Sequence, residues 1–401
     1  MISRRALIAG GAGTTLLAAL GYRAWDRGVF SAGKGPAFAP WDEWQGQAGD
    51  GARRPLHAAI LAANAHDTQP WLFAPSEDSI TVYADRARNL GSFDPFRREM
   101  HLSLGCAIEN LQLMALKLGL TAQCISTKGR LQLSPTDAAV EVAKITLWPL
   151  RDIHYSLEDD IRLADTIPRR HTNRGPYRPD QLILPTVLDD LAELFSSGPA
   201  RIVLLQDTGA RRELGDIIVD ATRRTISDKA MSEDSARWFR TGRHEVLGHR
   251  DGVTTDTAGL SPFMSVAAKM LPDMDAKSAD DFWLAATRDI HVPTATVLGL
   301  VMVQDRLDMT QAIAAGQAWQ RLHLKATVHG IAAQPMNQPV EMVDRDAMLG
   351  RPDTFKAALQ KLAGLKDAEA TFVFRLGYAE RPALPSPRRP LDDVIRKTGL
   401  A

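Results

Sequence analysis

Two stretches of this chain, 211 positions apart, decide how the fold is interpreted. Residues 105–123 read GCAIENLQLMALKLGLTAQ, and residues 316–334 read GQAWQRLHLKATVHGIAAQ. They align without a gap and share eight of 19 residues, including both glycines of each stretch. Apolar residues recur at helical spacing in both stretches, which predicts two long helices. A period this long indicates two copies of one fold rather than a solenoid, whose units are about 20–50 residues long. Two independent core helices that share an apolar stripe are the alternative.

Outward from these helices, short strands alternate with helical segments, which favours an α+β fold. The apolar patterns predict strands at 71–73, 79–84, 140–147, 201–205, 294–303 and 370–375. Helical periodicity predicts helices at 54–65, 98–118, 157–163, 185–195, 211–226, 310–330 and 355–362. We therefore expect two fused, subunit-like halves that form a pseudo-dimer, each with a central antiparallel-type sheet flanked by helices.

The expected halves span residues 40–160 and 161–401. Residues 228–280 are polar and mixed, with scattered glycines. Because this segment is long for a simple connection, we expect an inserted, partly helical flap within the second half.

Charge and cysteine content exclude some classes of protein. Lys+Arg and Asp+Glu both number 48, so the net charge is zero. A general nucleic-acid binder would carry a basic excess, so nucleic acid is not an expected partner. Cys106 and Cys124 are the only cysteines, too few for a disulfide framework. We expect two small apolar side chains, with a single disulfide as the alternative in an oxidising compartment.

The first 33 residues resemble an export signal. Arg4 and Arg5 precede a weakly hydrophobic run from Ala6 to about Tyr22, which is the twin-arginine pattern. The run is short for a membrane span, which needs about 20 apolar residues. We expect a periplasmic or exported protein, delivered by the twin-arginine machinery, with anchoring at the inner membrane by this segment left open. A Sec signal or an uncleaved anchor helix is the alternative.

Three polar segments carry the candidate chemistry. Residues 64–71, Asn-Ala-His-Asp-Thr-Gln-Pro-Trp, join a helix end to a strand, and such a corner can bind the polar edge of a planar ring. Residues 169–174, Arg-Arg-His-Thr-Asn-Arg, can converge on one phosphate, because guanidinium groups donate strong bonds to phosphate oxygens. Arg388 and Arg389 could complete that anion site. Taken singly, these segments could be an ordinary loop, a solvated basic loop and a basic tail.

Together these segments resemble the nitroreductase superfamily, and most closely its Acg-like branch of fused-subunit proteins. Gln69-Pro70-Trp71 matches the family's corner motif, and His66 and Thr68 agree with the Acg-like form. The family's Arg-x-Ser/Thr-x-Arg/Lys phosphate motif matches Arg170, Thr172 and Arg174, and His171 also fits. The resemblance covers roughly residues 50–397 and implies the nitroreductase fold and a bound FMN.

The resemblance also implies which residues hold the FMN. In relatives, backbone amides just after a proline approach flavin N5, which points to Met336 and Asn337 after Pro335. Family chains end with basic residues that reach the flavin phosphate. The implied FMN-binding residues are His66, Asp67, Thr68, Gln69, Arg170, His171, Thr172, Arg174, Met336, Asn337, Arg388 and Arg389.

The motifs are distributed unequally between the two halves. In family homodimers one subunit supplies the phosphate arginines and the other supplies the Gln-Pro-Trp corner. Here the corner occurs only in the first half and the Arg-x-Thr-x-Arg motif only in the second. The resemblance therefore implies one composite FMN site per chain and a protein that acts as a monomer.

The implied function is an FMN-dependent oxidoreductase that passes electrons from a nicotinamide or quinol donor to a nitroaromatic or quinone-like acceptor. The flavin would carry the chemistry, so no catalytic residue and no metal ion is assigned. Asp67 replaces the family's Asn, which puts ordinary turnover in doubt. The alternative is a non-enzymatic FMN-binding or sequestering protein. A zinc hydrolase or a serine hydrolase is disfavoured, because neither ligand spacing nor a Gly-x-Ser-x-Gly motif is present.

Overall fold

The computed structural model describes residues 17–133, 136, 138–151, 157–193 and 198–396. The paired arginines of the predicted export signal therefore lie outside the described residues, as do the last positions of the helix predicted at 185–195.

The first half contains a four-stranded antiparallel sheet. Its strands are β1 (Trp71–Pro75), β2 (Ser79–Ala84), β3 (Leu120–Ser126) and β4 (Val140–Pro149), in the order β1-β2-β4-β3. Along β2, buried Ile80, Val82 and Ala84 alternate with partly exposed residues, so one face of the sheet packs on the core.

The second half repeats this sheet with the same strand order. Its strands are β5 (Arg201–Leu205), β8 (Val297–Val303), β9 (Ala332–Pro335) and β10 (Glu369–Gly377), in the order β5-β8-β10-β9. All pairings are antiparallel. Every residue of β8 is buried, which explains its continuous apolar sequence.

The two long helices of the repeat cross at two glycines. They are α3 (Arg98–Lys117) and α12 (Met309–Val328). A Cβ added at Gly105 would lie 2.1 Å from the carbonyl oxygen of Ile313, and one added at Gly316 would lie 1.9 Å from that of Leu102. Leu102 and Ile313 are themselves 211 positions apart, so each glycine contacts the repeat equivalent of the other's partner. The crossing thus has the reciprocal form of a two-fold interface.

Polar pairs along the same crossing follow the same two-fold rule. Arg321 Nε donates to Glu109 at 2.6 Å, and Gln320 Nε2 donates to the buried Asn110 at 2.7 Å. The pairs 109–321 and 110–320 exchange under the 211-residue offset. Together with the matching sheets, they confirm the predicted α+β pseudo-dimer with two antiparallel sheets flanked by helices.

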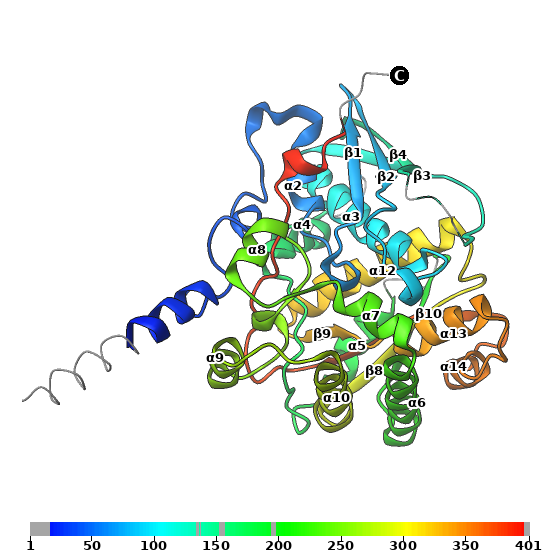
Figure 1. Cartoon of the computed structure of the whole chain (residues 1–401). Helices are drawn as coiled ribbons and strands as arrows, with labels where there is room; N and C mark the ends of the chain where they lie inside the picture. Colours follow the sequence, from blue (N-terminus) through cyan, green and yellow to red (C-terminus); the bar gives the residue numbers. More distant parts are fainter. Residues whose placement is uncertain (1–16, 134–135, 137, 152–156, 194–197, 397–401) are drawn as a thin grey trace, which may run out of the picture.

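Shorter helices pack around this core, two on the long helices and three on the second sheet. They are α2 (Leu56–Ala59), α4 (Glu158–Thr166), α5 (Pro185–Glu193), α13 (Gln338–Met348) and α14 (Lys356–Ala363). Figure 1 shows α3 and α12 between the β1–β4 sheet and the β8–β10 sheet.

A long segment, residues 206–296, separates β5 from β8. It contains α6 (Thr208–Ser227), α7 (Lys229–Ala236), α8 (Arg243–His249), α9 (Pro262–Met270), α10 (Ala276–Ala286), the π-helical turn η7 (Thr287–His291) and α11 (Val292–Thr294). It also contains a small parallel pair, β6 (Phe239–Arg240) with β7 (Val253–Thr254). The flap predicted at 228–280 falls inside this segment.

The C-terminal segment returns to the first half. The backbone amide of Arg396 donates to the carbonyl of Phe73 in β1 at 2.7 Å, and Ile395 forms a parallel bridge with the same residue. Figure 1 shows this red segment running from the second half up to β1. The end of the chain therefore fastens the two halves together.

Several elements of the structure were not predicted, and others were predicted with the wrong bounds. β3 and β9 were missed, because Gly119 and Gly330, at φ of 76° and 70°, end the long helices and turn the chain directly into a strand. α13 was missed because its buried residues mix apolar Val340 and Val343 with acidic Glu341 and Asp344. The helix predicted at 54–65 covers only Leu56–Ala59, and the strand predicted at 294–303 begins at Val297. Among the described residues, no helix is both long and apolar enough to cross a bilayer.

Candidate functional site

The predicted corner motif adopts a strained backbone. His66, Asp67 and Gln69 have φ of 48°, 55° and 49°, although none is glycine. The side chain of Asn64 holds the turn, accepting from the Gln69 amide at 2.8 Å. Non-glycine residues in the left-handed conformation cost roughly 1–3 kcal/mol each, and such residues cluster at functional sites. The corner is therefore a built feature rather than an ordinary loop.

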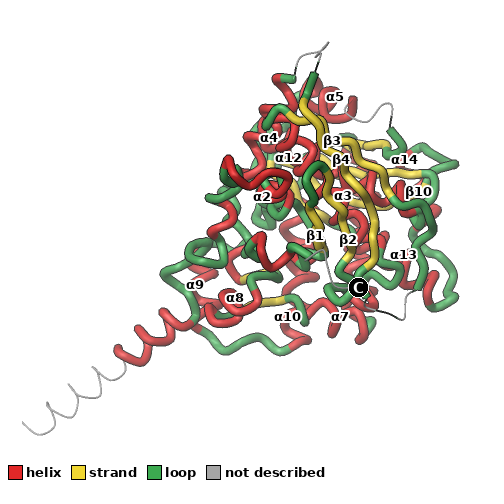
Figure 2. The backbone as a smooth tube through the Cα atoms, turned by 90° about the horizontal axis from the view of Figure 1, so that it is seen from above, coloured by secondary structure: helices red, strands yellow, loops and turns green. Residues whose placement is uncertain are grey.

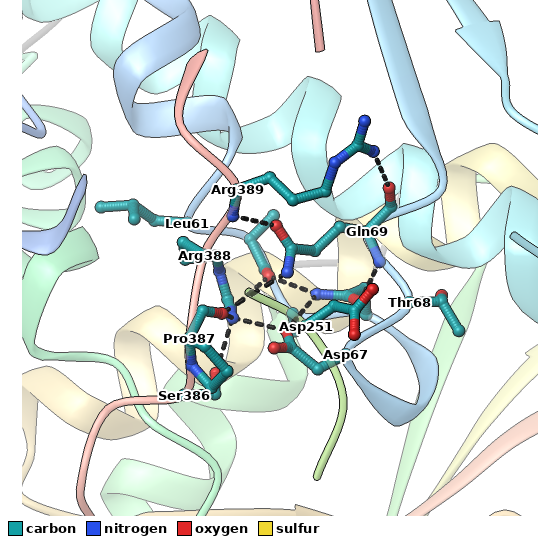
Figure 3. Close-up of polar contacts among 12 residues, drawn as sticks. Leu61, Asp67, Thr68, Gln69, Asp251, Ser386, Pro387, Arg388 and Arg389 are labelled. Atoms are coloured by element: carbon teal, nitrogen blue, oxygen red, sulfur yellow. Dashed lines mark hydrogen bonds and ion pairs between the residues drawn. The ribbon is translucent and has the colours of Figure 1, made fainter. Parts of the chain in front are cut away.

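Gln69 binds the C-terminal segment instead of facing a cavity. Its Oε1 accepts from the Arg389 amide at 2.8 Å, and its Nε2 donates to the Arg250 carbonyl at 2.8 Å (Figure 3). Gln69 is fully buried, and both ends of its side-chain amide are hydrogen-bonded to protein groups. The structure thus places the Gln69 amide against the C-terminal segment and the flap, and contact of Gln69 with a planar ring stays a prediction.

Two buried arginines from distant parts of the sequence meet behind the corner. Arg170 donates to the Leu61 carbonyl at 3.0 Å, and Arg388 donates to the Ala62 carbonyl at 3.1 Å. Arg388 also forms an ion pair with Asp67 (Figure 3). Arg170 and Arg388 are each 2% exposed. The end of α2 thus collects one arginine from each of two predicted motifs.

These arginines line a small cavity of about 40 Å³. Its walls come from the corner, the Arg-x-Thr-x-Arg motif, the flap and the C-terminal segment. The lining residues are Ala63, Asn64, Asp67, Arg170, His171, Thr172, Arg174, Gly252, Val253, Thr257, Leu384, Ser386 and Arg388. Six of the twelve predicted FMN-binding residues are therefore brought together here.

The cavity carries an excess of buried positive charge. Arg170, Arg174 and Arg388 face it, and Asp67 is the one acid among its described lining residues. Burial lowers the pKa of all three arginines, that of Arg170 to about 9, with Arg388 as a further cause for Arg170. The lowered arginine pKa values mean that too little negative charge lies near the guanidinium groups to stabilise their charged form. A bound anion would supply that charge.

Several polar atoms of the site are buried without a partner. Among the described residues, the Nε atoms of Arg170 and Arg388 and Nδ1 of His171 have no hydrogen-bond partner. Unpaired buried donors are rare and call for an explanation such as a ligand. Burial and the neighbouring Arg170 lower the pKa of His171 to about 3, so this ring is neutral.

Asp67 is the acid that opposes the arginines. Burial raises its pKa to about 7, and the ion pair with Arg388 acts in the opposite direction. Oδ1 holds the Arg388 guanidinium, whereas Oδ2 has no partner among the described residues. Asp67 therefore pairs with Arg388, to which an incoming anion would otherwise bind.

Trp41 is a site residue that sequence reasoning missed. Its ring lies edge-on to His171 at 4.5 Å between centroids, and the Arg388 guanidinium stands 4.9 Å from its ring centroid. Its indole Nε1 donates to the Ser386 carbonyl at 2.8 Å. No local motif marked Trp41, which lies with Trp44 in the stretch that follows the predicted export segment.

The other six predicted residues lie outside the cavity lining. His66 packs edge-on against Phe93 and contacts Ser235, and the Thr68 carbonyl accepts from Arg88. Gln69 and Arg389 bind each other, as described above.

Met336 and Asn337 are engaged elsewhere. The Met336 amide, expected to approach a flavin, donates to the Val373 carbonyl at 2.8 Å, because β9 continues along β10. The Asn337 side chain binds Glu99 and accepts from the Val373 amide at 3.1 Å. These two residues are not brought to the arginine cavity.

Comparison with known proteins gives relatives along most of the chain. No family model matches. A Mycobacterium tuberculosis protein that bears the provisional name NAD(P)H nitroreductase is 27% identical over 349 residues, covering 86% of this chain and 90% of that protein. A second one, provisionally named NAD(P)H nitroreductase Acg, is 24% identical over 351 residues, covering 85% and 93%.

Solved structures show a more distant likeness. The FMN- and NADPH-dependent nitroreductase NfnB from a Sphingopyxis strain matches with a TM-score of 0.40 and 16% identity, covering 59% of this chain and 99% of that one. NfnB from Mycobacterium smegmatis, solved with NADPH, matches with a TM-score of 0.36 and 18% identity, covering 59% and 100%. This chain is therefore similar, along most of its length, to proteins that bear the provisional name NAD(P)H nitroreductase, Acg among them.

Proposed function

We propose that this protein is an FMN-dependent oxidoreductase of the nitroreductase type. The observation that carries the proposal is the cavity in which three buried arginines face a single carboxylate. Such a site suits a phosphate dianion, since guanidinium groups donate charge-assisted bonds to phosphate oxygens. The relatives' provisional name, NAD(P)H nitroreductase, supports the redox assignment.

The residues of the cavity fit the phosphate end of FMN. Arg170, Arg174 and Arg388 would hold the phosphate, and the unpaired Nε atoms of Arg170 and Arg388 are donors available to it. Thr172 would supply a hydroxyl. When bound, the flavin supplies the ability to accept and pass on electrons. The protein would bind and orient it, and residues 252–257 of the flap would cover it.

An absorbance spectrum of the purified protein tests cofactor identity directly. We expect the flavin bands around 370 and 450 nm, from a ligand that is released on denaturation and identified as FMN by mass. In Arg170→Ala and Arg174→Ala, FMN retention should fall about tenfold or more, because a charge-assisted contact contributes roughly 1.5–3 kcal/mol. Arg130→Ala is the control, since Arg130 is exposed and paired with Asp305. Equal retention in the three variants would contradict the assignment.

Turnover separates an enzyme from a sequestering protein. We propose a nicotinamide or quinol donor and a nitroaromatic or quinone-like acceptor. Bleaching of the bound flavin by NADH, NADPH or a quinol, followed by recovery with an acceptor, would establish a reductase. A bound flavin that stays yellow with every donor would instead favour FMN storage, which the flap wall of the cavity and the acidic Asp67 would suit.

We further propose that one chain is one complete unit. The halves 40–160 and 161–401 would act as fused subunits, with one FMN and no need for a second chain. The N-terminal 33 residues would direct twin-arginine export to the periplasm. Light scattering and fractionation of cells that express the full chain are the corresponding measurements.

A further inference from the structure

Large apolar side chains gather on two neighbouring segments at one side of the molecule. Of the 21 large hydrophobic residues exposed in the described chain, ten lie in residues 17–30 or 262–274. These segments form a small part of the chain, so the clustering is not a general property of its surface. Phe263 is 80% exposed and Phe30 77%. Exposed apolar patches of this kind mark interaction surfaces.

The two segments are fastened to each other. The N-terminal helix, described over residues 17–26, ends against the C-terminus of α9. Arg23 donates to the carbonyls of Met270 and Leu271 at 2.8 Å each, and Arg27 to that of Lys269 at 3.2 Å. Guanidinium groups at the last carbonyls of a helix satisfy them and complement its dipole. The apolar residues of both segments are thus held in one arrangement.

The figures place this surface at the edge of the molecule. Figure 1 shows the N-terminal helix, in blue, projecting from the body with α9 beside its base, and Figure 2 shows the same pairing from above. Leu17, Leu20 and Tyr22 are exposed on the projecting part. A projecting apolar helix is unfavourable in water, because its side chains gain nothing from burial against the body.

Basic side chains border the same surface. A cleft of about 200 Å³ lies between residues 27–38 and the flap, and its charged lining residues are Arg27, Lys34, Arg240, Arg243, Lys269 and Asp256. Among the described residues, Lys34 and Arg243 have no acidic partner, and Arg243 stands 5.1 Å from the Trp25 ring centroid. The surface therefore combines exposed aromatic and aliphatic groups with uncompensated positive charge.

We propose that this surface, formed by residues 17–34 and 262–274, lies on an anionic lipid bilayer. Apolar side chains on one side, aromatic residues near the base and basic residues beside them are the features of interfacial binding. In the sequence, the weakly hydrophobic run from Ala6 to Tyr22 leads into the exposed apolar residues of this helix, and such a run favours a bilayer over a groove on a partner protein. Lys34 and Arg243 would add attraction to anionic headgroups.

Lipid contact would reach the arginine cavity through one short wall. Val253 and Thr257 line that cavity, whereas Thr254, Thr255 and Asp256 line the basic cleft on the other side. Lys269 of α9 ties this wall to the N-terminal segment, binding Asp256 and the Gly28 carbonyl, the latter at 3.0 Å. A bilayer would therefore brace the flap that covers the cavity.

Vesicle binding by the full chain tests the proposal. We expect sedimentation with phosphatidylcholine vesicles that contain phosphatidylglycerol, and weaker sedimentation with phosphatidylcholine alone or at high salt. Phe263→Ser should lower the lipid partition coefficient about tenfold or more, because burying a phenylalanine side chain is strongly favourable. The double variant Lys34→Gln/Arg243→Gln should remove most of the preference for anionic vesicles. Ile125→Ser is the matched control, since Ile125 is 66% exposed on β3, which belongs to the sheet of the first half and lies outside the proposed surface.

The outcomes separate the proposal from its rivals. No binding to anionic vesicles, or equal loss in Phe263→Ser and Ile125→Ser, would overturn it. A soluble dimer that Phe263→Ser converts to a monomer would overturn it in favour of self-association. Phe263 is too exposed for its replacement to unfold the chain, and circular dichroism checks this. FMN retention, measured on the same samples, reports on the proposed function independently of lipid binding.

Discussion

Replacing Asp67 by Asn should change how FMN affinity depends on pH. Asp67 holds the Arg388 guanidinium inside the arginine cavity, and burial raises its pKa to about 7. Below that pH the side chain is protonated and releases Arg388 to a bound phosphate. Above it, a carboxylate competes for Arg388 and repels the phosphate. Wild-type affinity for FMN should therefore fall as the pH rises through about 7, where the carboxyl loses its proton.

The expected size follows from the charges in the cavity. Two unit charges about 8 Å apart interact with roughly 2 kcal/mol at an effective dielectric constant of about 20, which is roughly a thirtyfold change in affinity. Asp67→Asn removes this repulsion and keeps an oxygen that can accept from Arg388. Asparagine also tolerates the left-handed backbone at this position, so the fold should not suffer.

The assay is quenching of FMN fluorescence by the apoprotein at about pH 6 and about pH 8, in the wild type and the variant. The second ionisation of the FMN phosphate, with a pKa of about 6, affects both proteins alike, so the ratio of their dissociation constants isolates Asp67. The variant should bind more tightly at the higher pH and similarly at the lower. A ratio that is the same at both pH values, or a variant that binds more weakly, would refute the reasoning.

Three further predictions concern stability. Gly316→Ala should destabilise the fold by at least about 2 kcal/mol, because its Cβ would meet a backbone carbonyl of α3, whereas Gly248→Ala on the open face of α8 should be neutral or stabilising; urea denaturation compares them. Glu341 and Glu99 share a buried hydrogen bond that requires a proton, and burial raises both pKa values, that of Glu99 to about 7, with the charge of Glu99 as a further cause for Glu341. Because the folded state then holds protons that the unfolded state releases, stability should fall from about pH 4.5 upward, and Glu341→Gln should flatten this slope by about 1.4 kcal/mol per pH unit in melts across that range; identical slopes would contradict it. Arg170→Met should raise the unfolding free energy of the FMN-free protein by about 1–2 kcal/mol, since the under-compensated charge disappears, although it weakens FMN binding; a lower melting temperature would count against this.

The sequence predicted the duplicated core well because the repeat is carried by packing. The paired glycines, the apolar stripes and the terminating glycines of 105–123 and 316–334 are all local signals of two crossing helices. β3 and β9 were not predicted, since each strand follows directly on a long helix whose apolar pattern dominates the local sequence. Residues 338–346 of α13 are all buried and mix Glu341 and Asp344 with apolar side chains, so no clean apolar stripe marks the helix in the sequence.

For the site, the sequence indicated the charges but not their geometry. The sequence predicted Arg170, Arg174 and Arg388 as one site, because clustered arginines stand out in a chain of zero net charge. The structure places all three on one cavity. The destination of Gln69 depends on the path of the C-terminal segment, which no local pattern encodes. Trp41 reaches the site only through the tertiary fold, and Met336 is committed to β10 by its backbone amide.

The crossing of the last residues onto β1 sets the order of assembly. Arg388 lies in this segment, which pairs with Phe73 more than 300 positions earlier in the chain. Both sheets and both long helices are complete before residue 378, so a nascent chain can fold its frame while the anion cavity still lacks a wall. Loading of the proposed FMN would therefore follow synthesis, and a chain cut after residue 381 would lose Arg388 from the anion cavity together with the contacts that Ile395 and Arg396 make to Phe73.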